Sequence, residues 1–340
     1  MHRKPSHAVA LSGLLGISSI LSGTPAFAAP PATEEVLGVM GMDKEQIAEL
    51  AQGQPVAYAL TEGRDDEIAA GIAWLLPAPS IKVAEHLRQE NPDPLDVDVT
   101  GYGLLKEHGG PISLAPIVLS REEIETLSAA EPGDAFNLSA AEIDSLKTLK
   151  QNAKFFEGRL LQHYREILFR RFEAYRRQGI SAIAPYVREE GPDSKPSLEL
   201  RQAANASPIL NRYLPALHKA WRDYPKPLPA GADEAFPWVE KKVENRPAVI
   251  LRHRISMDWN GGVLVLTREF YAPHSYNSSQ WITGCLPYHN GTVVFQQVRS
   301  YTDQVAGIAS DVKHIIGRKL LKDKMLKSYK RLCAVVDQCR

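Results

Sequence analysis

Hydrophobic and polar residues alternate with a period of two over the C-terminal third of the chain, a pattern typical of antiparallel strands. The pattern runs from Trp238 to Ser300, with hairpin turns expected at DWNGG and HNG. It then changes to helical spacing from Asp303 to about Val335. We therefore predict a meander and a closing helix over residues 236–336. The stripe expected to be buried on that helix consists of Val305, Ile308, Val312, Ile315 and Ile316.

The rest of the chain mixes strands and helices. Two strand-like runs, PVAYALTEG and EIAAGIAWLL, precede a helix in IKVAEHLRQ and a strand in LDVDVTGYGLL. Apolar residues then recur every three or four positions, and Ser120 with Glu123 and Ser139 with Glu142 have the spacing of capping boxes. We predict a helical insertion at about 141–225. The order of elements indicates an α+β fold.

The N-terminus has the three parts of a secretory signal peptide. A basic segment, MHRKPSH, is followed by the uncharged apolar run AVALSGLLGISSILSG and by small residues in TPAFA. We predict a signal peptide at residues 1–28, cleaved after Ala28, and a single α+β domain at residues 29–340. No later run reaches the roughly 20 apolar residues that a membrane span needs. The expected location is the periplasm or the extracellular space.

Charge and cysteine content narrow the expected partners. The chain has 40 basic and 40 acidic side chains, so no net charge attracts nucleic acid or an anionic membrane over long range. In an oxidising compartment Cys333 and Cys339 are close enough in sequence to form a disulfide, which would leave Cys285 as a buried thiol. The cysteine spacing fits neither a zinc site nor a haem attachment site. We expect no metal and no cofactor.

Polar residues concentrate in REFYAPHSYNSSQWITG, residues 268–284. Alternation places Glu269 and Tyr271 on one strand face, and Pro273 marks the end of that strand. His274 and Tyr276 would follow at a rim where two strands part. A histidine beside two phenols permits acid–base catalysis by His274 with Tyr271 or Tyr276, contact with the polar end of a ligand, or a purely structural role.

Two further residues join the candidate ligand-binding set. His253 shares a strand face with apolar neighbours, as a hydrogen-bonded core histidine or a cavity-lining one would. Arg299 is expected to pair with Asp303, which would cap the closing helix. The complete candidate set is His253, Glu269, Tyr271, His274, Tyr276, Trp281 and Arg299.

Two resemblances follow from these segments. A long C-terminal helix on a curved antiparallel sheet, with EIAAGIAWLLPAPSIKVAEHL as an opening strand, turn and helix, resembles the helix-grip fold of START-type lipid-binding domains. That resemblance implies a cavity for an apolar ligand between sheet and helix. The runs YRRQGISAIAPY, YAPHSY and RSYTDQVAG are similar to an uncharacterised family of secreted bacterial proteins. That family has no assigned activity.

Three functions are consistent with these patterns. The first is a non-catalytic periplasmic or secreted protein that binds a hydrophobic or lipid-like ligand in a cavity between sheet and helix. The second is a periplasmic hydrolase or isomerase that uses His274 and a nearby tyrosine. The third is a structural or interaction protein of the cell envelope, with the helical insertion as the partner surface.

Overall fold

The fold is described from a computed structural model covering residues 1–2, 30–89, 96, 98–133, 135–152, 156–307 and 309–336. The predicted signal peptide falls almost entirely on residues 3–29, outside this part of the chain, as do Ile308 and Cys339 and therefore the predicted Cys333–Cys339 disulfide. Cys285 is a buried free thiol, as expected.

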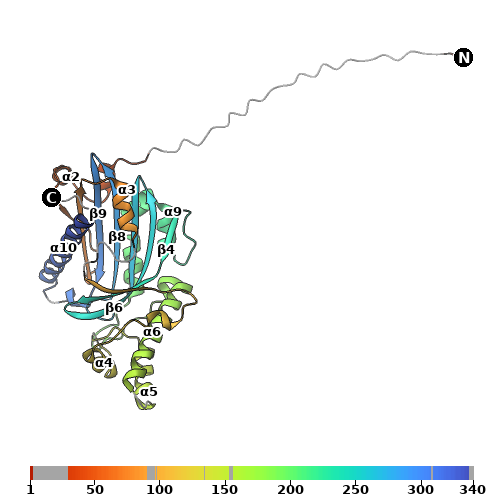
Figure 1. Ribbon diagram of the computed structural model, residues 1–340, viewed down its shortest axis with the longest axis vertical. Coiled ribbons are helices and arrows are strands. Elements are labelled where there is room, and N and C mark those ends of the chain that lie inside the picture. Colours follow the sequence, from red (N-terminus) through yellow and green to blue (C-terminus); the bar gives the residue numbers. More distant parts are fainter. Residues whose placement is uncertain are drawn as a thin grey trace. The chain divides into compact units, whose positions relative to one another are not determined.

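The described residues form an α+β fold (Figure 1). The helices are α1 (Thr33–Val39), α2 (Lys44–Ala51), α3 (Ser80–Arg88), α4 (Arg121–Ser128), α5 (Ala140–Asn152), α6 (Phe156–Gln178), α7 (Pro196–Asn205), α8 (Pro208–Tyr213), α9 (Pro215–Arg222) and α10 (Ser310–Val335). The strands are β1 (Val56–Ala59), β2 (Glu67–Leu76), β3 (Val99–Leu104), β4 (Ala232–Ala235), β5 (Pro237–Val243), β6 (Arg246–Trp259), β7 (Gly262–Tyr271), β8 (Ser278–Tyr288) and β9 (Gly291–Tyr301). Three short 3₁₀ helices are η1 (Pro111–Leu114), η2 (Gly179–Ala182) and η3 (Asp303–Val305).

Within the described residues, nine strands form one antiparallel sheet in the order β1-β2-β9-β8-β7-β6-β5-β3, and β4 pairs with the second half of the long strand β6. The predicted meander is confirmed. Three of its four hairpins close through two-residue turns, including Asn260-Gly261, where both residues have positive φ, whereas residues 272–277 join β7 to β8. Asparagine and glycine tolerate that conformation, so the sequence fixes the register between β6 and β7. The sequence did not predict β4.

The two faces of the sheet carry different helices because side chains alternate along each strand. On β7, Leu264 and Leu266 pack with α1, α2, α8 and α9 on one side, which we call the helical-block face. Val263 and Val265 pack with α3 and α10 on the other side, which we call the α10 face. Both faces are therefore covered, and Figure 1 shows α3 and α10 against the sheet.

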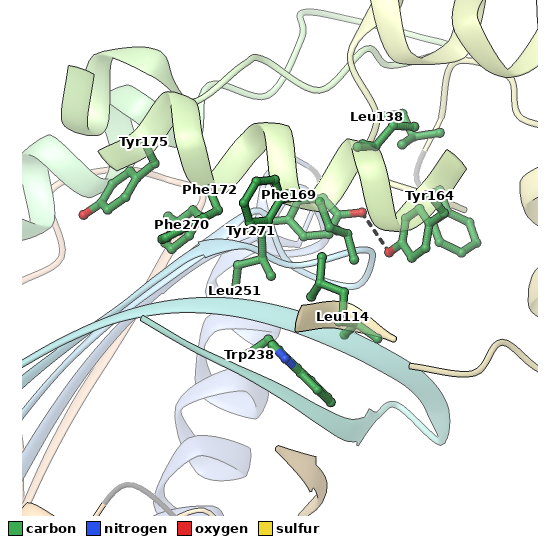
Figure 2. Packing of buried hydrophobic residues seen from close by; sticks show 14 of the residues in the cluster. Leu114, Leu138, Tyr164, Phe169, Phe172, Tyr175, Trp238, Leu251, Phe270 and Tyr271 are labelled. Carbon is green, nitrogen blue, oxygen red and sulfur yellow. Dashed lines mark hydrogen bonds between the residues drawn. The ribbon is translucent and has the colours of Figure 1, made fainter. Parts of the chain in front are cut away.

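Helices α4, α5 and α6 lie beyond one end of the sheet (Figure 1) and form an aromatic core with β5, β6 and β7. In Figure 2, α6 directs Phe172 and Tyr175 toward Phe270 and Tyr271 of β7. The rings of Tyr175 and Phe270 stack with centroids 4.2 Å apart, and the hydroxyls of Tyr164 and Tyr271 lie 3.2 Å apart. This contact attaches α6 to the sheet through buried aromatic area.

A β-bulge in β7 changes which side chains share a face. Leu251 pairs with Tyr271 and Arg252 with Glu269, so Phe270 is an extra residue on β7. Phe270 and Tyr271 therefore both enter the aromatic core, whereas Glu269 lies on the α10 face beside Arg252. The prediction that Glu269 and Tyr271 share a face is wrong because alternation cannot be counted across a bulge.

The closing helix differs from its prediction in start and orientation. It begins at Ser310 rather than Asp303, because Gly307 and Ala309 adopt positive φ after η3. Its buried side chains include Met325 and Leu332, whereas the predicted stripe residues Val312, Ile315 and Ile316 are exposed. The predicted stripe is therefore wrong for these three residues, because the helix turns the opposite side toward β2.

Candidate functional site

A cleft of about 260 Å³ lies between the α10 face of the sheet and α10. Its walls come from β5, β7, β8, β9 and one side of α10. The lining residues are Asp98, Lys241, Lys242, Val243, Glu244, Glu269, Tyr276, Ser279, Trp281, Ser300, Leu320, Leu321 and Lys324. Three of the residues predicted from the sequence, Glu269, Tyr276 and Trp281, are brought together here.

The inner wall of the cleft is a buried ion cluster. Glu269 Oε1 accepts hydrogen bonds from Lys241 Nζ at 3.2 Å and from Arg252 Nη2 at 2.8 Å. Asp96 pairs with the same two cations, and Lys324 of α10 reaches Asp98 at 3.2 Å. The hydroxyl of Tyr276 donates to Glu269 Oε2 at 2.6 Å.

The cluster keeps its members ionised. Burial alone would raise the pKa of Glu269, but the charges of Lys241 and Arg252 lower it to about 2. Burial would likewise raise the pKa of Asp96, yet neighbouring cations hold it well below its usual range. Burial lowers the pKa of Lys241, which the carboxylates partly offset, and Asp96 and Glu269 raise the pKa of Lys324 against its burial.

The charges of the cluster balance. The carboxylates of Asp96, Asp98 and Glu269 face the cations of Lys241, Arg252 and Lys324. Each carboxylate already has a cationic partner. The cluster therefore has no surplus charge with which to compensate an ionised ligand group, and burying such a group beside it would be costly.

Trp281 contributes an unused hydrogen-bond donor. Its Nε1 atom is buried and has no partner within the described residues. The indole ring lines the cleft, and Lys324 Nζ lies 5.9 Å from the centroid of that ring. A buried N–H without a partner is costly, so an acceptor oxygen that reached Nε1 would gain a hydrogen bond.

Tyr271 and His274 lie outside the cleft lining. Tyr271 is fully buried in the aromatic core beside Tyr164, and burial raises its pKa well above the usual range. His274 Nε2 donates to the Pro247 carbonyl at 2.8 Å, and Nδ1 lies 2.9 Å from Ser275 Oγ. Burial lowers the pKa of His274. The three residues predicted to act together are therefore apart: Tyr271 lies in the aromatic core, His274 binds the Pro247 carbonyl, and Tyr276 lines the cleft.

His253 is enclosed on the helical-block face. Its Nε2 lies 2.9 Å from Glu234 Oε1 and its Nδ1 lies 2.8 Å from the Tyr175 hydroxyl, which also accepts from Arg268. Because a carboxylate only accepts, Nε2 carries the proton and Nδ1 accepts from Tyr175. Burial lowers the pKa of His253 to about 4, so the ring is neutral at physiological pH.

Arg299 forms a different ion pair from the predicted one. Arg299 Nη1 binds Glu67 Oε1 at 2.5 Å, whereas Asp303 pairs with Arg188 at 2.7 Å. The expected Arg299–Asp303 pair and the capping of the closing helix by Asp303 are therefore both wrong. The cause is η3, which separates Asp303 from the start of α10.

Four members of the ion cluster were not predicted from the sequence: Asp96, Lys241, Arg252 and Lys324. A partial signal was present, because strand alternation places Arg252 on the opposite side of β6 from His253, and the structure has it there, bound to Glu269. Lys241 lies in a strand with alternating apolar and polar residues, a pattern that predicts an exposed lysine. Asp96 and Lys324 come from segments that are distant in the sequence. Only the three-dimensional pairing identifies them as one cluster.

A second hollow, of about 430 Å³, lies beside Glu62, Arg64, His314 and Arg318. Several of its polar groups bind one another: Glu62 Oε2 accepts from Arg318 at 2.7 Å, and His314 contacts Glu62 and the Asp65 carbonyl. Arg64 pairs with Asp66. With these groups already partnered, this hollow is a weaker candidate than the cleft at Trp281.

Among the described residues there is no group of three or more metal-ligating side chains arranged to hold an ion, and no helix long and apolar enough to cross a membrane. Comparison with protein families and with curated proteins gave no match. Among solved structures, that of Ara h 8.0201 is similar over 41% of this chain and 87% of that chain, with 11% identity and a TM-score of 0.23. At that score the likeness carries no argument, and the predicted secreted bacterial family stays a prediction.

Proposed function

We propose that the protein binds a small, uncharged, lipid-like molecule in the cleft between the sheet and α10. This arrangement would be a helix-grip in the sense of the START resemblance, with α10 as the gripped helix. The observation that carries the proposal is Trp281, whose ring lines the cleft and whose buried indole N–H has no partner among the described residues. Such a donor is expected to bind an acceptor oxygen.

The lining defines the class of ligand. Leu320 and Leu321 offer apolar surface on one wall, and Trp281 offers a donor beside the balanced ion cluster. In a molecule with an alcohol, ester or amide oxygen on an alkyl chain, the oxygen would accept a hydrogen bond from Trp281 and the chain would contact the leucines. Such a molecule introduces no charge. The volume, about 260 Å³, is slightly below that of typical small-molecule pockets, which favours a short chain.

Calorimetric titration with decanol, decanoate and decylamine tests this proposal. Decanol is expected to bind, and the two ions of the same chain length are expected to bind at least about tenfold more weakly because the cleft has no spare charge. Mass spectrometry of solvent extracts of the purified protein should show a neutral lipid-like molecule. Absence of binding by all three compounds, together with an empty extract, would refute the proposal.

Two tryptophan variants locate the binding site. Trp281→Phe removes the N–H and keeps an aromatic ring, and should weaken decanol binding about tenfold. Trp74→Phe is the matched control, because Trp74 Nε1 is also buried and has no partner in the described part of the chain, but the ring lies in the packed core against Tyr329. Equal decanol affinities of the two variants would place the ligand elsewhere.

Export from the cytoplasm remains part of the proposal. Sequencing the N-terminus of the protein recovered from the periplasm or medium should give Ala29 as the first residue. Recovery of intact Met1 from the cytoplasm would contradict it. The alternative of hydrolase or isomerase activity gains no support from His274, whose two ring nitrogens both contact protein atoms.

A further inference from the structure

The outer side of α10 carries an exposed apolar stripe. Val312, Ile315, Ile316 and Leu320 have exposed fractions of 57%, 62%, 54% and 65%. Their spacing of three and four residues places them on one side of the helix. Figure 1 shows α10 beside the sheet with no other element on its outer side in that view. The described part of the chain does not cover this stripe.

The same helix already has a separate buried side. Met325, Leu332 and Cys333 pack against the sheet with Trp74 and Val265. A helix that only covers a sheet needs one apolar side. The stripe is therefore a second apolar surface, and four adjacent exposed aliphatic side chains are unusual on a soluble protein without a partner.

The charge on α10 identifies the partner. Between Ser310 and Val335 the helix has eight lysines and arginines and two aspartates. Lys319, Lys327 and Lys330 are exposed and form no ion pair within the described residues. Basic side chains beside exposed aliphatic ones are the combination with which helices bind the surface of an anionic bilayer.

We propose that α10 docks on an anionic lipid bilayer, with Val312, Ile315 and Ile316 entering the headgroup region and the exposed lysines contacting acidic headgroups. A second copy of the chain is a poorer partner for this side, because two copies face to face would bring like charges together. The inference does not depend on the proposed cleft ligand. Ile315 and Ile316 do not line the cleft.

Vesicle co-sedimentation tests the docking. The full chain should bind phosphatidylcholine vesicles containing about one third phosphatidylglycerol, bind pure phosphatidylcholine vesicles weakly, and be released by high salt. The double variant Ile315→Glu/Ile316→Glu should lose at least about tenfold in partitioning. The triple variant Lys319→Gln/Lys327→Gln/Lys330→Gln should bind the anionic vesicles more weakly than the unmodified protein does. Its weak binding to pure phosphatidylcholine vesicles should not change.

Ile112→Glu is the matched control, because Ile112 is 77% exposed but lies in η1 rather than in α10. It should bind vesicles as the unmodified protein does. Both the control and the double variant should retain decanol binding, which separates a failure of docking from a failure of the cleft proposal. Failure of the unmodified protein to bind anionic vesicles would overturn the docking. Analytical ultracentrifugation showing a dimer that the double variant dissociates would also overturn it, by assigning the stripe to a second copy.

Discussion

The two faces of the sheet bury polar groups in different ways. On the helical-block face, His253 and Arg268 lie among aromatic rings, and the Arg268 guanidinium is 3.9 Å from the centroid of the Trp221 ring. On the α10 face, Glu269 and Lys241 belong to an ion cluster that borders a cleft. The comparison shows that a buried polar residue alone does not indicate a binding site. A neighbouring cleft, lined by Trp281, is what distinguishes the α10 face.

The largest expected effect is loss of the central carboxylate on the α10 face. Glu269→Gln would leave Lys241 and Arg252 buried with less opposing charge, and should lower the free energy of unfolding by about 3–5 kcal/mol at neutral pH. The loss should shrink under acid. The folded pKa of Glu269 is about 2, below the ordinary 4.5, so its contribution is present above pH 4.5 and is lost as the pH falls toward 2.

Urea denaturation at neutral and acidic pH measures this effect. Tyr276→Phe is the companion variant, because it removes one hydrogen bond to Glu269 without removing a charge, and should cost about 1 kcal/mol. An equal loss for Glu269→Gln at both pH values would show that electrostatic pairing is not what stabilises this face.

A pair of leucine variants compares the packed face with the stripe. Leu264→Ala removes a buried side chain from the helical-block face and should cost about 3 kcal/mol through lost burial and a cavity. Leu320→Ala makes the same chemical change at an exposed position of α10 and should cost less than about 0.5 kcal/mol. Thermal denaturation measures both. A large loss for Leu320→Ala would mean that the stripe is covered within the chain itself.

Acid should destabilise the helical-block face through His253. The folded pKa of His253 is about 4, below the ordinary 6.5, so the stability that its neutral ring provides is present above pH 6.5 and lost as the pH falls through 4. The total is roughly 2–3 kcal/mol. His253→Gln should be less stable than the unmodified protein near neutral pH, with a gap that narrows on acidification. A gap of constant size across this pH range would contradict the assignment.

A smaller pH-dependent effect concerns Glu199 of α7, whose carboxyl group accepts hydrogen bonds from Ser278 and Asn277. Burial raises its pKa from 4.5 to about 7, so its contribution to stability is present below pH 4.5 and is lost as the pH rises through 7. Glu199→Gln should therefore stabilise the protein by about 1–2 kcal/mol above pH 7 and change little under acid. Equal stability of the Glu199→Gln variant and the unmodified protein in alkaline buffer would exclude a raised pKa of Glu199.

Local patterns predicted the strands of the meander and most helices. The Asn260-Gly261 turn and the Ser120 capping box of α4 act over a few residues, and the structure has both. Alternation also separated His253 from Arg252 correctly, because no bulge lies between them.

Prediction failed where distant segments decide the outcome. The extra residue Phe270 places Tyr271 on the opposite face of the sheet from the one predicted. The 3₁₀ helix after Thr302 places Asp303 where it forms an ion pair with Arg188. Apolar residues lie on two sides of α10, and only the contact with β2 determines which of the two sides is buried. For the candidate site, Glu269, Tyr276 and Trp281 were identified from sequence, whereas Asp96 and Lys324 were not.

Gly317 has a consequence for the width of the cleft. A β-carbon at this position would lie 2.4 Å from Cδ1 of Ile68 on β2, so α10 approaches the sheet closely only because the side chain is missing. Leu320 and Leu321, which form one wall of the cleft, follow within about one helical turn. A methyl group at position 317 would increase the distance between α10 and β2. The distance between α10 and the sheet, and with it the width of the cleft, is thus set by a residue that does not line the cleft.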